Sequence, residues 1–238
     1  MSKVKLHNRI LKLTIVLVIG VFWLLYRSIY LKEDEGIKEY QYCFKDVVLI
    51  DYVNDITAYL SQNLQHRDYL LIFGSNLLDM VLPVYMIYFI FKGVSWQTIF
   101  NMALFYNLRG PLIQNLSGFE YYDTYLFDNP GFFSFSVPYY RASDFFFSGH
   151  AGCAILCAFQ FKKWGHNSIY VFGIVVGFLE GFIMVLLRTH YFIDIVFGLI
   201  AGHYFFILAE IFAIPFDYYL PLSIKQRQIN LLHKSKTC

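Results

Sequence analysis

The sequence predicts an all-α fold, a polytopic membrane bundle of six transmembrane helices with both termini in the cytosol. Hydrophobic residues make up 58% of the 238 residues and charged residues only 15%, whereas soluble domains carry about a quarter charged residues. Aromatic residues reach 21%, which suits a protein with broad membrane–water interfaces. The formal net charge of +2 is too small to indicate nucleic-acid binding.

Six apolar stretches approach the roughly 20 residues that an α-helix needs to cross a bilayer. The first is longer than the apolar part of a signal peptide, and no small-residue cleavage site follows it. The third is interrupted by polar residues, including Asn107 and Arg109. We expect residues 1–238 to form one transmembrane domain, of which 215–238 are a basic cytosolic tail. The predicted spans are 11–31, 69–91, 97–118, 145–162, 167–187 and 190–214.

The distribution of lysine and arginine predicts the orientation of these spans, because cytosolic loops are enriched in both. On one side, despite its longer loops, the basic residues are only Lys32, Lys38, Lys45, Arg67 and Arg141. The other side holds Lys3, Lys5, Arg9, Lys12, Lys92, Lys162, Lys163, Lys225, Arg227, Lys234 and Lys236. The richer side contains both termini, which we therefore expect in the cytosol, with the opposite loops in a lumen.

The two long lumenal loops differ in composition. Residues 32–68 are acidic, which we interpret as a solvated face in preference to a cation site. Residues 119–143 are crowded with aromatic side chains around Pro130, Gly131 and Pro138. We expect this second loop to lie along the interface beside the site. Its aromatic residues form either an interfacial belt or a cage that binds a quaternary ammonium headgroup by cation–π contact.

Small and charged residues inside the spans give further expectations. Glycines recur every four positions in the last two spans, which predicts that 167–187 and 190–214 pack as a tight hairpin. Asp79 and Arg109 both fall near mid-bilayer, and we expect them to pair. Glu180 either borders a wet cavity or hydrogen-bonds a neighbouring helix. The four cysteines show no evident disulfide pair and no zinc-binding spacing.

Two polar motifs stand at the predicted lumenal ends of the spans. The string Asp-Phe-Phe-Phe-Ser-Gly-His, which ends at His150, opens the fourth span. The string Arg-Thr-His-Tyr-Phe-Ile-Asp, which begins at Arg188, opens the sixth. His190 and Asp194 are four residues apart and share a helix face. At this spacing a carboxylate can hold one imidazole nitrogen and leave the other free as a base or nucleophile.

Two histidines, a carboxylate and an arginine, with no cluster of metal ligands, predict group transfer through a phosphohistidine without metal or cofactor. In this interpretation His190 attacks phosphorus, while Asp194 orients it and stabilises the imidazolium. His150 protonates the departing alkoxide and then deprotonates the incoming acceptor. The equatorial oxygens are stabilised by a further set, Arg188, Ser148 and the backbone N–H groups near Gly149.

Ser-Gly-His followed later by His-x-x-x-Asp resembles the type 2 phosphatidic acid phosphatase (PAP2) superfamily. Asp-x-x-Phe-Ser-Gly-His and His-Tyr-x-x-Asp resemble its sphingomyelin synthase branch, and the fuller strings are similar to its phosphatidylcholine:diacylglycerol cholinephosphotransferases. The resemblance implies six spans and a triad of His150, His190 and Asp194. The residues that would support this triad are Asp144, Tyr191 and Arg109.

The same resemblance implies that phosphocholine moves from a phospholipid donor to diacylglycerol or ceramide. The hydrolytic members carry Lys-x6-Arg-Pro, which is missing here. They also carry a proline where this chain has Phe147 and an arginine where it has Met184. These departures favour a headgroup transferase. A lipid phosphate phosphatase and a non-catalytic membrane scaffold or channel are the alternatives.

The last five residues, 234–238, resemble the Lys-x-Lys-x-x signal that returns membrane proteins to the endoplasmic reticulum. Such a signal is read by a receptor and is useful only on a cytosolic tail. We therefore expect a multi-pass protein of the endoplasmic reticulum membrane with a lumenal active site. The Golgi and the plasma membrane are the alternative locations.

Overall fold

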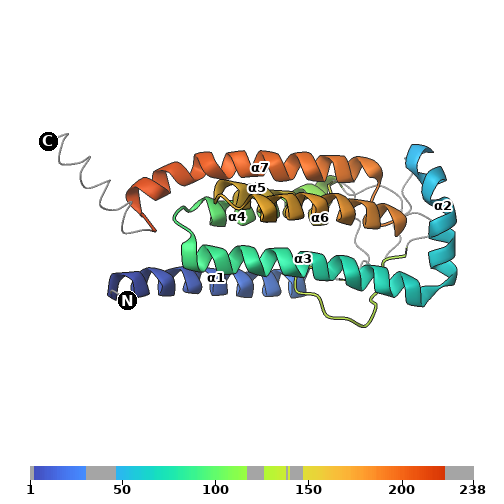
Figure 1. Cartoon of the computed structure of the whole chain (residues 1–238), viewed down its shortest axis with the longest axis horizontal. Coiled ribbons are helices and arrows are strands. Elements are labelled where there is room, and N and C mark those ends of the chain that lie inside the picture. The colour runs from blue at the N-terminus through green and yellow to red at the C-terminus, as the bar shows by residue number, and fades with distance from the viewer. Residues whose placement is uncertain (1–2, 31–46, 117–125, 138, 140–146, 223–238) are drawn as a thin grey trace.

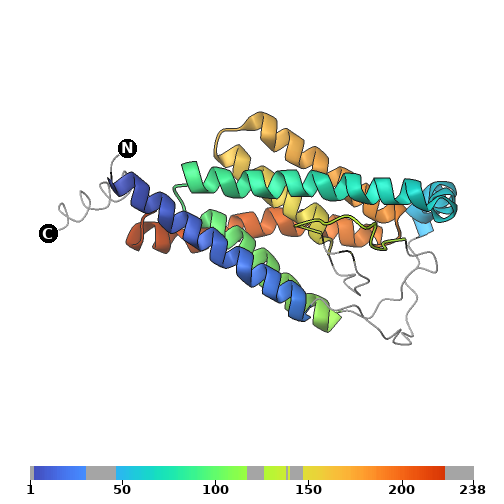
Figure 2. The same ribbon diagram turned by 90° about the horizontal axis from the view of Figure 1, so that it is seen from below.

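The computed structural model describes residues 3–30, 47–116, 126–137, 139 and 147–222. These residues form helices and loops and include no strand, so the all-helical prediction is confirmed for the described part of the chain. Most helices run along one common axis, and α2 lies across one end of the bundle (Figures 1 and 2). The helices are α1 (Lys3–Tyr30), α2 (Val47–Gln62), α3 (Leu64–Lys92), α4 (Gln97–Leu116), α5 (Gly149–Lys163), α6 (Asn167–Leu186) and α7 (Phe192–Tyr219).

A helix occupies each of the six ranges that the hydrophobic pattern predicts, although the boundaries move by several residues. Of the described helices, α3, α6 and α7 are long and apolar enough to cross a membrane, by length and composition. Their exposed side chains include large apolar ones such as Phe178, Phe182, Ile200 and Ile211. An apolar exterior of this kind belongs to a membrane protein.

Helix α5 is the centre of the bundle. It has only 15 residues, and every side chain from Ala151 to Ala158 is buried. Glycines bring the neighbouring helices close to it on both sides. A Cβ at Gly173 of α6 would lie 2.9 Å from Ala158 Cβ, and a Cβ at Gly198 of α7 would lie 2.6 Å from Ser148 O. Helix α5 is therefore held between α6 and α7.

The prediction that the last two spans pack against each other as a tight hairpin is wrong. Helices α6 and α7 contact each other much less than each contacts α5. Close approach of α6 and α7 is seen at Gly181, where a Cβ would lie 2.5 Å from Ile195 Cγ2. The glycine spacing correctly indicates close helix packing. It does not say which helix fills the space, and here that helix is α5.

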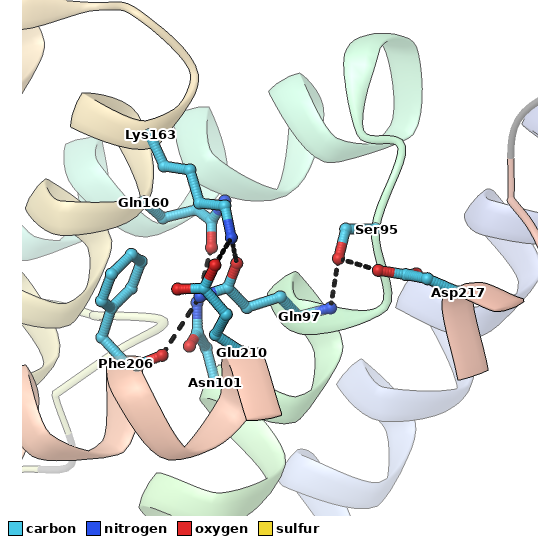
Figure 3. A network of polar contacts seen from close by, with 8 residues as sticks. All are labelled: Ser95, Gln97, Asn101, Gln160, Lys163, Phe206, Glu210 and Asp217. Atoms are coloured by element: carbon cyan, nitrogen blue, oxygen red, sulfur yellow. Dashed lines mark hydrogen bonds and ion pairs between the residues drawn. The ribbon is translucent and has the colours of Figure 1, made fainter. Parts of the chain in front are cut away.

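A polar network joins α4, α5 and α7 (Figure 3). It lies at the end of the bundle opposite α2 (Figure 1). Lys163 Nζ lies 2.6 Å from Gln97 Oε1 and 2.7 Å from Glu210 Oε1. Asn101 Nδ2 donates to Gln160 Oε1 at 2.8 Å. At the same end Asn8 Nδ2 of α1 donates to Leu222 O at 3.1 Å, so the first helix and the residues after α7 meet there. These contacts fix the helices at the end remote from the two motifs.

Residues 126–137, here called the strap, follow α3 from its first turns to its middle. Asp128 Oδ2 accepts from Arg67 Nη1 at 2.9 Å near the start of α3. Asp79, in the middle of α3, accepts from Phe135 N at 3.1 Å and Ser136 N at 2.8 Å, and also from Ser136 Oγ. Twelve helical residues separate the two anchors, a rise of about 18 Å. The described part of the predicted interfacial loop therefore runs inward along α3.

Candidate active site

The first motif ends in the first turn of α5. Ser148 is the N-cap residue, and its Oγ accepts from Ala151 N at 3.4 Å. Ser148 N donates to Asp194 O at 2.9 Å, so the backbone of the first motif is bonded directly to that of the second. His150, the second residue of α5, is thereby held beside the start of α7. Asp144 lies outside the described residues.

The second motif begins at the C-terminal turn of α6. Arg188 N donates to Val185 O at 3.2 Å, and Thr189 N donates to Met184 O at 3.0 Å. These two bonds form a Schellman motif, in which the residue at the Arg188 position adopts the left-handed conformation and is usually glycine. Arg188 adopts it with φ of 58°. A left-handed conformation costs a non-glycine residue about 1–2 kcal/mol, and strain of this kind gathers at functional sites.

His190 and Asp194 lie within ion-pair distance. The prediction that they share a helix face is wrong, because His190 precedes the first residue of α7 by two positions. The turn at the start of α7 brings them together instead. Nδ1 of His190 is 3.6 Å from Oδ2 of Asp194, and the two side chains are 2% and 3% exposed. This separation is slightly longer than a hydrogen bond. The same Oδ2 accepts from Tyr191 N at 3.0 Å, which fixes the carboxylate at the start of α7. Because Nδ1 faces the carboxylate, Nε2 is the nitrogen available for chemistry.

The rings of His150 and His190 lie close together at the first turn of α5. Their ring centroids are 6.4 Å apart, with an angle of 68° between the ring planes. Phe127 of the strap lies on another side of His150, with its ring centroid 6.0 Å away. Tyr139 contacts Phe127 in turn, at 5.7 Å between centroids. Some of the aromatic residues in the described part of the loop therefore pack around His150.

The side chain of Arg188 is held by α2, which sequence analysis missed. Arg188 Nη2 donates to Asn54 Oδ1 at 2.8 Å, and Arg188 is only 3% exposed. Thr57 Oγ1, one turn further along α2, donates to Leu186 O at 2.9 Å. The buried residues Val53, Thr57 and Leu60 have helical spacing. This pattern in the acidic loop could have revealed α2.

Arg109 approaches the site from α4. Its Nε donates to Phe147 O at 3.3 Å, and its Cζ lies 5.8 Å from the centroid of the Phe147 ring. A Cβ at position 149 would be 2.9 Å from this Cζ, so Gly149 leaves room for the guanidinium. The expected pair between Asp79 and Arg109 does not form. Asp79 accepts hydrogen bonds from the strap instead. Two arginines therefore lie close to the paired histidines.

Glu180 lies deeper, on α6. Its side chain is fully buried, and neither carboxylate oxygen has a hydrogen-bond partner among the described residues. Gly74 of α3 makes room for it, since a Cβ there would lie 2.9 Å from Glu180 Oε1. Of the two alternatives for Glu180, the hydrogen bond to a neighbouring helix is not formed within the described residues. The same residues contain no group of three or more His, Cys, Asp or Glu that could hold a metal ion.

Comparison with known proteins connects this geometry to a family. Residues 142–211 match the family described as PAP2 superfamily, C-terminal. This segment includes both motifs and the whole of α5 and α6. The match supports the PAP2 superfamily, whose domain fits phosphatase or phosphotransferase chemistry on lipid phosphates. No curated protein and no solved structure matched the chain.

Proposed function

We propose that this protein is a lipid headgroup transferase that moves phosphocholine from phosphatidylcholine to diacylglycerol or ceramide. The observation that carries the proposal is the approach of His150 to His190, at 6.4 Å between ring centroids, with Asp194 behind His190. At this distance both rings can contact the same phosphate group. The Asp194 carboxylate lies beside Nδ1 of His190, which assigns the nucleophilic role to Nε2.

In the first step, Nε2 of His190 attacks the phosphorus of phosphatidylcholine and forms a P–N bond. The bond from phosphorus to the glycerol oxygen breaks, and His150 gives its proton to the departing alkoxide, so that diacylglycerol leaves. The positive charge on the His190 ring is stabilised by the Asp194 carboxylate 3.6 Å away. The product of this half-reaction is phosphocholine bound to His190.

In the second step the acceptor hydroxyl loses its proton to His150 and attacks phosphorus, and the P–N bond breaks. Neutral His190 is restored, and His150 is again protonated. Arg188 and Arg109 provide positive charge for the equatorial oxygens, together with Ser148 and the N–H groups near Gly149. Arg188 and His190 are 3% exposed. Such burial supports transfer to a lipid hydroxyl in preference to hydrolysis.

The proposed setting is a six-span protein of the endoplasmic reticulum membrane, with both termini cytosolic and the site lumenal. Asn8 and Leu222 meet at one end of the bundle and the site lies near the other, as this topology requires. Protease protection of terminal tags in sealed microsomes tests the orientation. Tags that resist digestion in intact microsomes would overturn it, and imaging of the tagged chain separates the endoplasmic reticulum from the Golgi and the plasma membrane.

The deciding experiment supplies choline-labelled phosphatidylcholine to the purified protein in vesicles, with diacylglycerol, ceramide or no acceptor. Label in a new lipid identifies a transferase, and incorporation with ceramide alone identifies the sphingolipid reaction. Diacylglycerol exchange is detected because the donor and acceptor carry different acyl chains. Free phosphocholine or inorganic phosphate as the main product would show a hydrolase instead.

Variants assign the chemistry to the site. His190→Ala is expected to abolish both transfer and the acid-labile labelled protein that forms when the acceptor is withheld. His203→Ala is the matched control, because His203 is exposed on α7 and packs against Phe159. If His190→Ala retained full transfer, His190 would not be the nucleophile. If neither product formed with the wild-type chain, the scaffold alternative would be favoured.

A further inference from the structure

A large apolar pocket lies between α1, α3 and α4. Its volume is about 690 Å³, within the range of ligand sites. Helix α1 contributes residues including Val16 and Gly20, α3 contributes Leu82 and Met86, and α4 contributes Met102. The space remains because α1 packs on α3 and stands away from α4. A Cβ at Gly20 would have no neighbouring atom within 4 Å.

The pocket has one polar end. Phe135 and Ser136 of the strap line it there, and Asp79 holds both residues through their backbone N–H groups. Tyr106 and Asn107 of α4 also line the pocket. The remaining wall is almost entirely hydrocarbon. A molecule that is polar at one end and apolar along its length therefore matches the wall in one orientation.

This polar end adjoins the candidate active site. Tyr106 OH lies 3.6 Å from Cys153 Sγ, and Cys153 is one helical turn beyond His150 on α5. Asn107 lies two residues before Arg109 in α4. The guanidinium of Arg109 lies against Gly149. The strap that closes the pocket also contributes Phe127 to the wall of His150. The same segments thus border both the pocket and the site.

The length of the pocket suits one hydrocarbon chain. On α3 it extends from the level of Asp79, where Ser136 is bound, to Ile90. Eleven helical residues rise about 16 Å, roughly half of the 30 Å thickness of the bilayer hydrocarbon. Because the surrounding lipid is also apolar, such a pocket selects by shape and length.

We propose that this pocket holds one acyl chain of the phospholipid substrate while its phosphate lies between His150 and His190. The proposal rests on the proposed function for the identity of the lipid, and on the pocket for the position of the chain. The pocket would then make transfer sensitive to acyl length. Bulk membrane lipid and a helix from a second copy of the chain are the competing occupants.

Substitution of Gly20 tests the proposal directly. Gly20→Phe adds a ring to a residue that lines the pocket, at a position where the Cβ itself would meet no atom within 4 Å. We expect transfer from long-chain phosphatidylcholine to fall about tenfold or more, and the loss to shrink as the acyl chain is shortened. Val18→Phe is the matched control on the exposed side of α1, with activity unchanged. Equal activity of the two variants on every chain length would overturn the proposal.

A second measurement requires no change in the pocket and no catalysis. Phosphatidylcholine with a photoreactive group near the end of one acyl chain is cross-linked to the His190→Ala protein, and the labelled peptides are identified. Label at Met86 or Met102 supports the proposal even if transfer is never detected, a result that would count against the proposed function alone. Label confined to outward residues such as Ile200, or a cross-link between two copies at the pocket, would overturn it.

Discussion

The guanidinium of Arg109 lies against the backbone of Gly149, so that a Cβ at position 149 would be only 2.9 Å from Arg109 Cζ. The two residues come from α4 and from the first turn of α5. The glycine of the Ser-Gly-His motif therefore makes space for a cation beside His150. Glycine is required at position 149 because the Arg109 guanidinium occupies the space next to it. The reason is not conformational, since the backbone of Gly149 is not left-handed.

Gly149→Ala is expected to displace the Arg109 side chain and to lower the transfer rate by roughly ten- to a hundredfold, because small misplacements of catalytic groups are costly. The unfolding temperature should change little, since the displaced atoms are the end of a flexible side chain. Activity and thermal unfolding in detergent are measured together. Val18→Ala, on the exposed side of α1, is the control. Full activity of Gly149→Ala would contradict the assigned role of Arg109.

Arg188 should show a conflict between stability and activity. Arg188→Gly and Arg188→Ala both remove the side chain, but only glycine relieves the positive φ of 58°. We expect the glycine variant to be more stable than the alanine variant by about 1 kcal/mol, while both lose transfer. Denaturant unfolding gives the difference. Equal stabilities would mean that the turn has no left-handed strain.

Asn54 is expected to act as a positioning residue for Arg188. Asn54→Ala removes the acceptor of the 2.8 Å hydrogen bond, so the guanidinium loses its fixed direction and kcat should fall roughly tenfold. Asn54→Asp retains an acceptor oxygen and should recover most of the rate. Asp55→Ala, on the next and exposed residue of α2, is the matched control. A similar loss in Asp55→Ala would show that α2 acts only as a structural cover.

Gly202→Ala should weaken the packing of α7 on α5. The added Cβ would overlap the carbonyl oxygen of Gly152, a backbone atom that cannot move away without shifting its helix. Overpacking of this kind costs about 1–3 kcal/mol. Thermal unfolding in detergent should show a lower midpoint for Gly202→Ala and no change for Gly20→Ala. An unchanged midpoint in both would mean that the helices can separate at little cost.

Much of the site could be predicted from the sequence, because its parts are local. The four-residue spacing of His190 and Asp194 keeps them close, although the turn before α7 brings them together and not one helix face. The hydrophobic pattern locates α5 to within a few residues, since the predicted span begins at residue 145 and the helix at Gly149. The approach of His150 depends on long-range contacts, among them the bond from Ser148 N to Asp194 O. A sequence suggests such a contact only through motif resemblance.

Other features could not be predicted because they depend on tertiary packing. Glycine spacing indicates that another helix can pack closely on a face of α6. It does not indicate whether that helix is α5 or α7. The pairing of Asp79 with Arg109 is predicted only from their similar depth in the membrane. In the structure Asp79 accepts hydrogen bonds from the strap instead. The left-handed backbone at Arg188 has no signature in the residue type. Its partner Asn54 lies on α2, which is too short for a predicted span and is indicated only by the helical spacing of Val53, Thr57 and Leu60.

The brevity of α5 has a consequence for where the lipids meet. Fifteen residues rise about 22 Å, which is less than the roughly 30 Å of hydrocarbon in a bilayer. When Lys163 reaches one face of the membrane, His150 ends below the other, beneath the plane of the headgroups. In the proposed reaction, the donor and the acceptor would then meet below the headgroups, and neither lipid would have to leave the membrane for water.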